Sequence, residues 1–226
     1  MFRSWARRRM QPLNAISSYQ QEQYDAVSMV TEHLQAFSTD AVEALRTRCV
    51  EYRAFRNDVD IFLRTFFSET CTQKCYRNRL SACCQKEGII TFFADVVINA
   101  LFSSPDDLDA ILSVLRVPNT GSKCVYLGAN GCLWRIKPIG CEMFLCDAAA
   151  ASVFSRNPEI TVQWESLKAL KQDFTWPDHP VLFDAIEETF MVSGCSSSLM
   201  YFHNSPGLLR VKKQAGLLSI TAPCRP

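Results

Sequence analysis

Hydrophobic residues recur three and four positions apart along most of the chain, which is the pattern of helices with one buried face. Ser104 and Pro105 mark one helix start, because serine is a good N-cap and proline fits the first helical position. Gly194 marks the end of the helix predicted over 182–190, because glycine is common just after a helix C-terminus. The apolar stripes lie at 27–37, 42–66, 89–101 and 104–117, with shorter ones at 147–151, 167–174 and 182–190.

The stretch between Asn119 and Pro138 has a different pattern. Asn130-Gly131 is a tight-turn signal, and residues 132–136 alternate briefly between apolar and polar positions, so we expect a small hairpin or an ordered loop. A second hairpin is predicted around Ala215-Gly216 within the tail 206–226. With no internal repeat and no low-complexity linker, residues 1–226 are predicted to form a single domain.

Charge and hydropathy give no sign of export or of an extended charged partner. The net charge is +1, so we expect neither nucleic acid nor a membrane as a partner. The basic start, Arg7-Arg8-Arg9, is followed by polar residues rather than the apolar run of a signal peptide. No stretch approaches the roughly 20 apolar residues of a membrane span. The chain is therefore predicted to be cytoplasmic, where thiols stay reduced.

Eleven cysteines are many for a reducing compartment. Three stand alone, Cys49, Cys195 and Cys224, and are interpreted as small packing or surface residues. The other eight fall into two groups, and closely spaced cytosolic thiols are typical of metal-binding or catalytic sites. The first group is Cys71, Cys75, Cys83 and Cys84, and the second is Cys124, Cys132, Cys141 and Cys146.

Within the first group the spacing suits metal binding only in part. Cys71 and Cys75 are four residues apart, so on a helix their side chains are neighbours on one face. Cys83 and Cys84 are adjacent, and adjacent side chains diverge in regular structure. Both can face one site only if the backbone bends there.

The second group depends on turns. The Asn130-Gly131 turn folds Cys132 back towards the segment that carries Cys124. Cys141 and Cys146 are five apart and would not share a helical face, so at least one is expected at a helix end. Neither group alone forms an obvious cage of four ligands. We therefore expect the two groups to meet in space, across about 40 intervening residues.

Ligands made only of thiolates select zinc, iron–sulfur clusters or Cu(I). Zinc and a [4Fe–4S] cluster each take about four ligands, so eight candidates allow two centres, or one centre with spare thiols. The cofactor is predicted to be zinc or iron, and the residues do not choose between them. Basic residues between the cysteines could offset the thiolate charge: Lys74, Arg77, Arg79, Lys86, Lys123, Arg135 and Lys137.

Residues 124–141 (CVYLGANGCLWRIKPIGC) resemble the second half of the YkgJ-type cysteine-cluster family, described as zinc- or iron-chelating domains. The run that ends in Cys83-Cys84 resembles that family's first half, with wider spacing. Lys137 stands where the family has arginine, and Glu142 where a basic residue commonly follows the cysteine. The resemblance covers 71–146, with a helical insertion at 89–117, and it implies metal chelation.

The predicted fold is thus mostly α, a helical single domain with a small irregular or β-hairpin subregion that is rich in cysteine and binds metal. The predicted function is metal binding, with a metal ion as the partner and a protein partner left open. A related cysteine pattern in flagellin lysine N-methylases keeps a second hypothesis open, an iron–sulfur-dependent enzyme such as a protein lysine methyltransferase. A third hypothesis is a metal-stapled scaffold for protein interaction.

Overall fold

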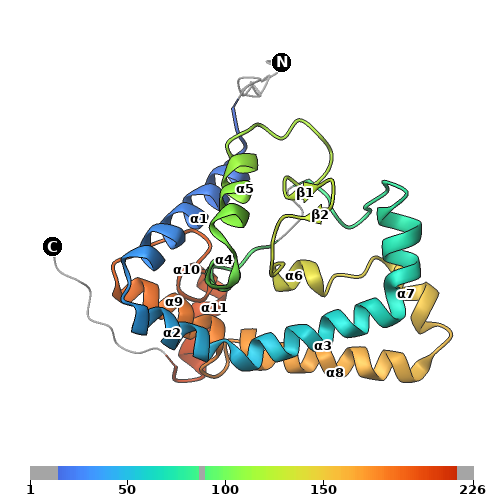
Figure 1. Cartoon of the computed structure of the whole chain (residues 1–226). Coiled ribbons are helices and arrows are strands. Elements are labelled where there is room, and N and C mark those ends of the chain that lie inside the picture. Colours follow the sequence, from blue (N-terminus) through green and yellow to red (C-terminus); the bar gives the residue numbers. More distant parts are fainter. Residues whose placement is uncertain (1–14, 87–89, 218–226) are drawn as a thin grey trace, which may run out of the picture.

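A computed structural model describes residues 15–86 and 90–217 of the chain, and these residues are mostly helical, as the sequence predicts (Figure 1). In chain order the described residues form α1 (Ser18–Ala36), α2 (Thr39–Arg48), α3 (Val50–Phe67), the π-helix η1 (Ser68–Tyr76), α4 (Phe93–Phe102), α5 (Pro105–Leu115), β1 (Leu127–Gly128), β2 (Gly131–Cys132), α6 (Ile139–Glu142), α7 (Asp147–Phe154), α8 (Pro158–Thr175), α9 (Leu182–Val192), α10 (Tyr201–Asn204) and α11 (Pro206–Gln214).

Most of the predicted helix signals are confirmed. Ser104 Oγ accepts a hydrogen bond from the Asp107 backbone N–H at 3.2 Å, and the Asp107 carboxylate accepts one from the Ser104 N–H at 3.0 Å, which closes the cap of α5. Gly194, with φ +85°, follows α9. The apolar stripe at 42–66, predicted to form one long helix, is instead divided between α2 and α3, with the junction at Cys49.

Two further predictions about local structure need correction. The short helix expected at 167–174 is the long helix α8, which begins with Pro158 in its first turn. The hairpin predicted around Ala215-Gly216 is wrong for the described residues, because α11 runs up to Gln214 and Gly216, with φ +72°, follows its C-cap. The remaining tail of that prediction, 218–226, and residues 87–89 at the start of the predicted insertion lie outside the described residues.

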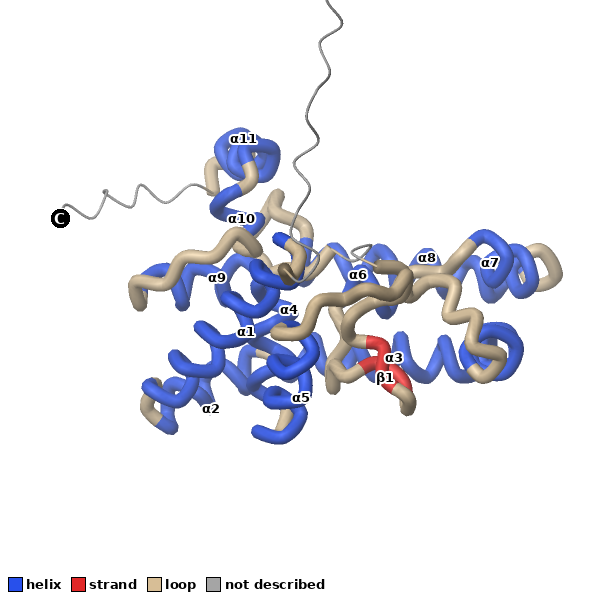
Figure 2. The backbone as a smooth tube through the Cα atoms, turned by 90° about the horizontal axis from the view of Figure 1, so that it is seen from above, coloured by secondary structure: helices blue, strands red, loops and turns tan. Residues whose placement is uncertain are grey.

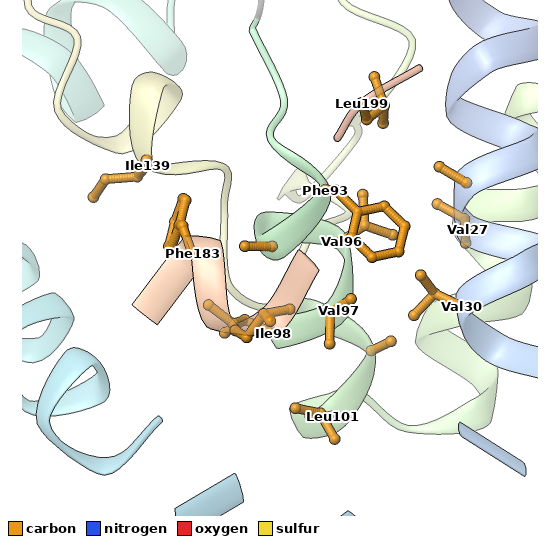
Figure 3. Packing of buried hydrophobic residues seen from close by; sticks show 14 of the residues in the cluster. Val27, Val30, Phe93, Val96, Val97, Ile98, Leu101, Ile139, Phe183 and Leu199 are labelled. Carbon is orange, nitrogen blue, oxygen red and sulfur yellow. The ribbon is translucent and has the colours of Figure 1, made fainter. Parts of the chain in front are cut away.

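The main hydrophobic cluster is built around α4. Every residue of this helix from Phe93 to Leu101 is buried. Figure 3 shows Phe93, Val96 and Val97 of α4 packed near Val27 of α1, with Phe183 of α9 close by. A helix that is buried on all sides, with Asp95 and Asn99 as its two polar residues, is stable only when it is surrounded, so α4 fixes the positions of α1 and α9.

A second, outer cluster lies at the far end of α3. Its buried members are Phe62, Phe67, Ala149, Val153 and Trp164. The rings of Phe62 and Trp164 stack with centroids 5.3 Å apart, which joins α3 to α8, and these two helices lie side by side in Figure 1. Leu63, Met143 and Leu167 pack against both clusters and connect them.

The loops that carry the strands β1 and β2 and the helix α6 lie between these two parts. Seen from above, they occupy the space between the α1–α5 side and the end where α7 and α8 lie (Figure 2). Most of the grouped cysteines are in this region and in η1 beside it.

Buried charges join the last helices to α9. Lys212 Nζ lies 2.6 Å from Asp184 Oδ1, and His203 Nε2 lies 3.1 Å from the same oxygen. Glu187 is fully buried and accepts a hydrogen bond from the Phe202 backbone N–H at 3.1 Å. Burial, with the nearby Asp184 carboxylate, raises the pKa of Glu187 to about 9.

Replacing Glu187 by glutamine should change how stability depends on pH. A carboxyl group whose pKa rises from near 4.5 to about 9 on folding destabilises the fold progressively as pH increases across that range. We therefore expect Glu187→Gln to be more stable than the wild type at pH 8, by a margin that shrinks towards pH 5, in urea unfolding curves. Glu188→Gln, at the exposed neighbouring position, is the matched control. Equal pH profiles for the two variants would contradict the assignment.

Candidate functional site

Six of the eight grouped cysteines line one cavity of about 790 Å³. They come from both groups, so the prediction that the groups meet in space is confirmed for these six. The rest of the wall includes apolar side chains such as Ile90, Leu127 and Phe144, together with Lys137. The cysteines of the wall are Cys83, Cys84, Cys124, Cys132, Cys141 and Cys146.

Cys71 and Cys75, the remaining two, lie on η1 rather than on an α-helix. The π-helical ladder closes with the Arg77 N–H bonded to the Thr72 carbonyl at 2.9 Å, a bond across five residues. π-Helical segments are rare and occur frequently at functional sites. Both cysteines are half-buried, and η1 contacts α7, which follows Cys146.

The loop after η1 bends sharply around Cys75. Arg79 and Ser81 have backbone φ angles of 60° and 39°, in the left-handed region that residues other than glycine seldom adopt. The Leu80 N–H donates to the Cys75 carbonyl at 3.0 Å, and the Ala82 N–H to the Cys75 sulfur at 3.3 Å. Backbone strain of this kind tends to concentrate at functional sites.

The same bend brings Cys83 and Cys84 together. The Cys84 N–H bonds the Ser81 carbonyl at 3.0 Å, and the two thiols are hydrogen-bonded to each other. The sequence predicts that these adjacent side chains face one site only where the backbone bends, and this is what the structure shows. The hydrogen bond lowers the pKa of Cys83 and raises that of Cys84, because the protonated thiol stabilises the neighbouring thiolate.

Backbone pairing joins the two cysteine groups. The Cys124 N–H donates to the Cys84 carbonyl at 3.0 Å, and the Lys86 N–H donates to the Ser122 carbonyl at 3.1 Å. Gln85 and Lys123 form an antiparallel bridge between these bonds. The two segments are therefore held in register although they are far apart in the sequence.

The predicted hairpin carries Cys132. Leu127 pairs with Cys132 and Gly128 with Gly131, and Gly131 has φ +116°. The Tyr76 hydroxyl donates to the carbonyl of Ala129 at 2.8 Å, which ties the tip of the hairpin to η1. The turn brings Cys132 back towards Cys124, as the sequence predicts.

Cys141 and Cys146 lie on different elements. Cys141 is within the short helix α6, and Cys146 is the N-cap of α7. This confirms that at least one of the pair lies at a helix end, and it explains how two cysteines that share no helical face both reach the cavity.

Three polar side chains that the sequence analysis did not single out position the second group. Asp95 of α4 accepts a hydrogen bond from the Ile139 N–H at 3.0 Å, and Asn99, one turn along, accepts one from the Ile136 N–H at 2.9 Å. Arg56 of α3 donates to the carbonyl of Lys137 at 2.8 Å. All three are buried, so α4 braces the cysteine loop from inside the core.

The signal for these anchors is present in the sequence. Arg56 follows Tyr52 by four residues on the apolar stripe, and Asp95 and Asn99 interrupt an otherwise apolar helix. A polar residue on a buried face needs a partner, because an unpaired buried polar group is costly. The pattern indicates that partners exist without saying which backbone groups they are.

The acidic residue next to Cys141, Glu142, is accommodated by two cations. Its carboxylate lies 3.0 Å from Lys137 Nζ and 3.7 Å from Arg56 Nη2, and only 8% of its side chain is exposed. The two cations compensate its charge. Glu142 therefore serves as a structural ion-pair partner that holds the loop against α3.

Burial favours the protonated form of the thiols of Cys124, Cys132 and Cys141. It raises the pKa of Cys124 and Cys132, against backbone hydrogen bonds from Tyr126 and Trp134 that lower it. Burial and the neighbouring thiols Cys132 and Cys124 raise the pKa of Cys141 to about 12. A cation in the cavity would reverse this effect, since thiolates are the form that binds metal.

The thiol sulfurs are not gathered tightly. All cysteines in the described ranges are free, and within residues 15–86 and 90–217 no three His, Cys, Asp or Glu side chains are close enough to hold a metal ion. Zinc–sulfur bonds are about 2.3 Å long, so sulfurs spread around a cavity of this size must move inwards to share one ion. The donor chemistry fits a thiophilic metal, and the present spacing is wider than a closed ligand set.

Two of the solitary cysteines lie away from the cavity. Cys49 is completely buried in the main cluster, and Cys195 is 7% exposed in the same cluster. Both fit the interpretation as packing residues. Cys224 lies outside the described residues.

No protein-family model, curated protein or solved structure gives a significant match to this chain. The resemblance to the YkgJ-type family therefore stays a prediction from the cysteine pattern. Among the described helices, none combines the length and the apolar character that crossing a membrane requires.

Removing the Arg56 guanidinium should loosen the loop that carries the second group. Arg56→Met leaves the Lys137 carbonyl and Glu142 without a buried donor, and breaking a buried pair costs about 3 kcal/mol of unfolding free energy. Arg64→Met is the matched control, because the Arg64–Asp60 pair is exposed and worth less than about 1 kcal/mol. Denaturant unfolding measures both losses. A similar small loss in the two variants would show that Arg56 is not an anchor.

Proposed function

We propose that this chain is a metal-binding protein whose grouped cysteines supply thiolate ligands to zinc or iron, an iron–sulfur cluster included. The observation that carries the proposal is the cavity lined by six cysteines from two groups about 40 residues apart. Thiols packed only as small apolar residues have no reason to converge from such distant segments on one cavity. Thiolates favour zinc, Cu(I) and iron–sulfur clusters over hard cations.

The surroundings of the sulfurs support the same function. Backbone N–H groups bond the sulfurs of Cys124 and Cys132, which favours the thiolate form of these two residues. Lys137 and Lys123 favour the thiolate of Cys83. The same hydrogen bonds and charges tune a bound centre once it is in place.

Access to the thiols favours metal handling or chemistry over a purely structural staple. Cys83 is exposed at the cavity, and Lys137 in its wall has 46% of its side chain exposed. Closed structural sites keep no open position, whereas sites that exchange metal or react need one. The bends at Arg79 and Ser81 lie in the loop between η1 and Cys83, where movement could bring the sulfurs closer.

The first test is metal content. Protein expressed in a reducing cytoplasm and purified without oxygen should contain zinc or iron, and elemental analysis with an absorption spectrum distinguishes the two. The variant Cys124→Ser/Cys132→Ser should lose at least half of the bound metal, because it removes two ligands from the cavity.

The matched control replaces the solitary cysteines together, as Cys49→Ala/Cys195→Ala/Cys224→Ala. Its metal content should equal that of the wild type, although the loss of the buried Cys49 side chain costs about 1 kcal/mol or more of stability. Wild-type protein that takes up neither zinc nor iron, even after anaerobic reconstitution, would rule out the proposed function. Metal loss in the control would show that the ligand set is wrong.

A further inference from the structure

Five of the eight grouped cysteines divide into two sets according to what they pack against. Cys124 belongs to the main cluster, and Cys84 and Cys132 pack against it. Cys71 and Cys146 pack instead against the outer cluster between α3, α7 and α8. This division does not follow the sequence, because each set draws members from both of the sequence groups.

The cavity wall holds six cysteines and places Cys141 beside the three that belong to the main cluster. Cys84, Cys124, Cys132 and Cys141 all lie on the wall, and we call them the inner set. Cys71, Cys75, Cys83 and Cys146 form the outer set, of which only Cys83 and Cys146 reach the wall. The outer set is assembled where η1 contacts α7.

Electrostatic neighbours agree with this division. Burial and then the thiols of Cys83, Cys146 and Cys75 raise the pKa of Cys71, so the outer members are close to one another. The pKa of Cys84 is raised first by its hydrogen bond with Cys83. Burial and the thiols of Cys83, Cys124 and Cys141 raise it further. Cys83 is also among the thiols that raise the pKa of Cys141, so Cys83 and Cys84 lie where the two sets adjoin.

The adjacent pair Cys83-Cys84 is where the two sets meet. Its two thiols are hydrogen-bonded, yet Cys83 is a neighbour of Cys71 on η1, while the Cys84 carbonyl accepts a bond from the Cys124 N–H at 3.0 Å. Both thiols lie on the cavity wall, and the turn at Cys83 places the pair between the two sets. The pair can therefore supply one thiol to each set. A single mononuclear site would not need two adjacent cysteines.

We propose that the chain holds two centres, each with four thiolates, one bound by the inner set and the other by the outer set. The proposal rests on the proposed function, since it assigns the ligands of that metal-binding region. Four thiolates are the full complement of one structural zinc ion or one [4Fe–4S] cluster. Dividing eight thiolates between two cations also limits the negative charge that any one centre must compensate.

Zinc serves as the probe for the test. Reduced, metal-free full-length protein is titrated with Zn²⁺ without oxygen, and the bound metal is counted after gel filtration. The wild type should bind two equivalents. The inner variant Cys124→Ser/Cys132→Ser and the outer variant Cys71→Ser/Cys146→Ser should bind one equivalent each, and the combination of all four substitutions should bind none.

Alkylation of the thiols, mapped by mass spectrometry, identifies the ligands and does not depend on the folding of any variant. Wild-type molecules that carry one zinc ion should have four protected thiols, all from the inner set or all from the outer set. Molecules that carry two ions should have all eight protected. Circular dichroism checks that each variant keeps the helical content of the wild type.

The outcomes separate the two proposals. A wild type that binds one equivalent, lost in the inner and the outer variant alike, overturns the two-centre assignment and leaves the metal-binding function intact. Protected thiols that mix the sets in singly loaded molecules overturn it as well. A wild type that binds no zinc and no iron overturns the metal-binding function and the two-centre assignment with it.

Discussion

The carboxyl group of Asp95 joins the helical core to the cysteine loop, and the rest of the site depends on this contact. It accepts one hydrogen bond from the Phe92 N–H at the start of α4 and another from the Ile139 N–H at the start of α6. Burial raises its pKa to about 6, which shows how costly the charge is in this place. The fold retains a carboxyl group there because two backbone donors from distant segments need the same acceptor.

Around this contact, the residues that pack the core and the segments that carry the cysteines lie in different parts of the structure. The main cluster around α4 and the outer cluster at the end of α3 use aromatic and aliphatic side chains, with Cys124 as the one grouped cysteine in the buried part of either cluster. The cysteine segments lie between the clusters and are held by directional bonds, such as Arg56 to the Lys137 carbonyl and Tyr76 to the Ala129 carbonyl. The helices supply a frame, and polar contacts hold the loops that carry the cysteines.

The sequence was sufficient for the elements whose signals are local. Apolar spacing located α3 and α9, the Ser104-Pro105 cap located α5, and Asn130-Gly131 located the hairpin, because each depends on residues close together in the chain. It was insufficient for the π-helical form of η1 and for the bends at Arg79 and Ser81, which depend on tertiary contacts. Arg56, Asp95 and Asn99 stand out as polar residues on apolar stripes, but the backbone groups that they bond carry no sequence signature.

The burial of α4 has a consequence for the order of events in the cell. Because α4 is buried against α1 and α9 by apolar side chains, the packing of the helical frame does not depend on an ion. In zinc fingers, by contrast, the unloaded chain is unfolded and binding and folding are one event. Under the proposed metal-binding function, a chain whose frame packs in this way would select its metal through the supply of thiophilic ions and not through folding.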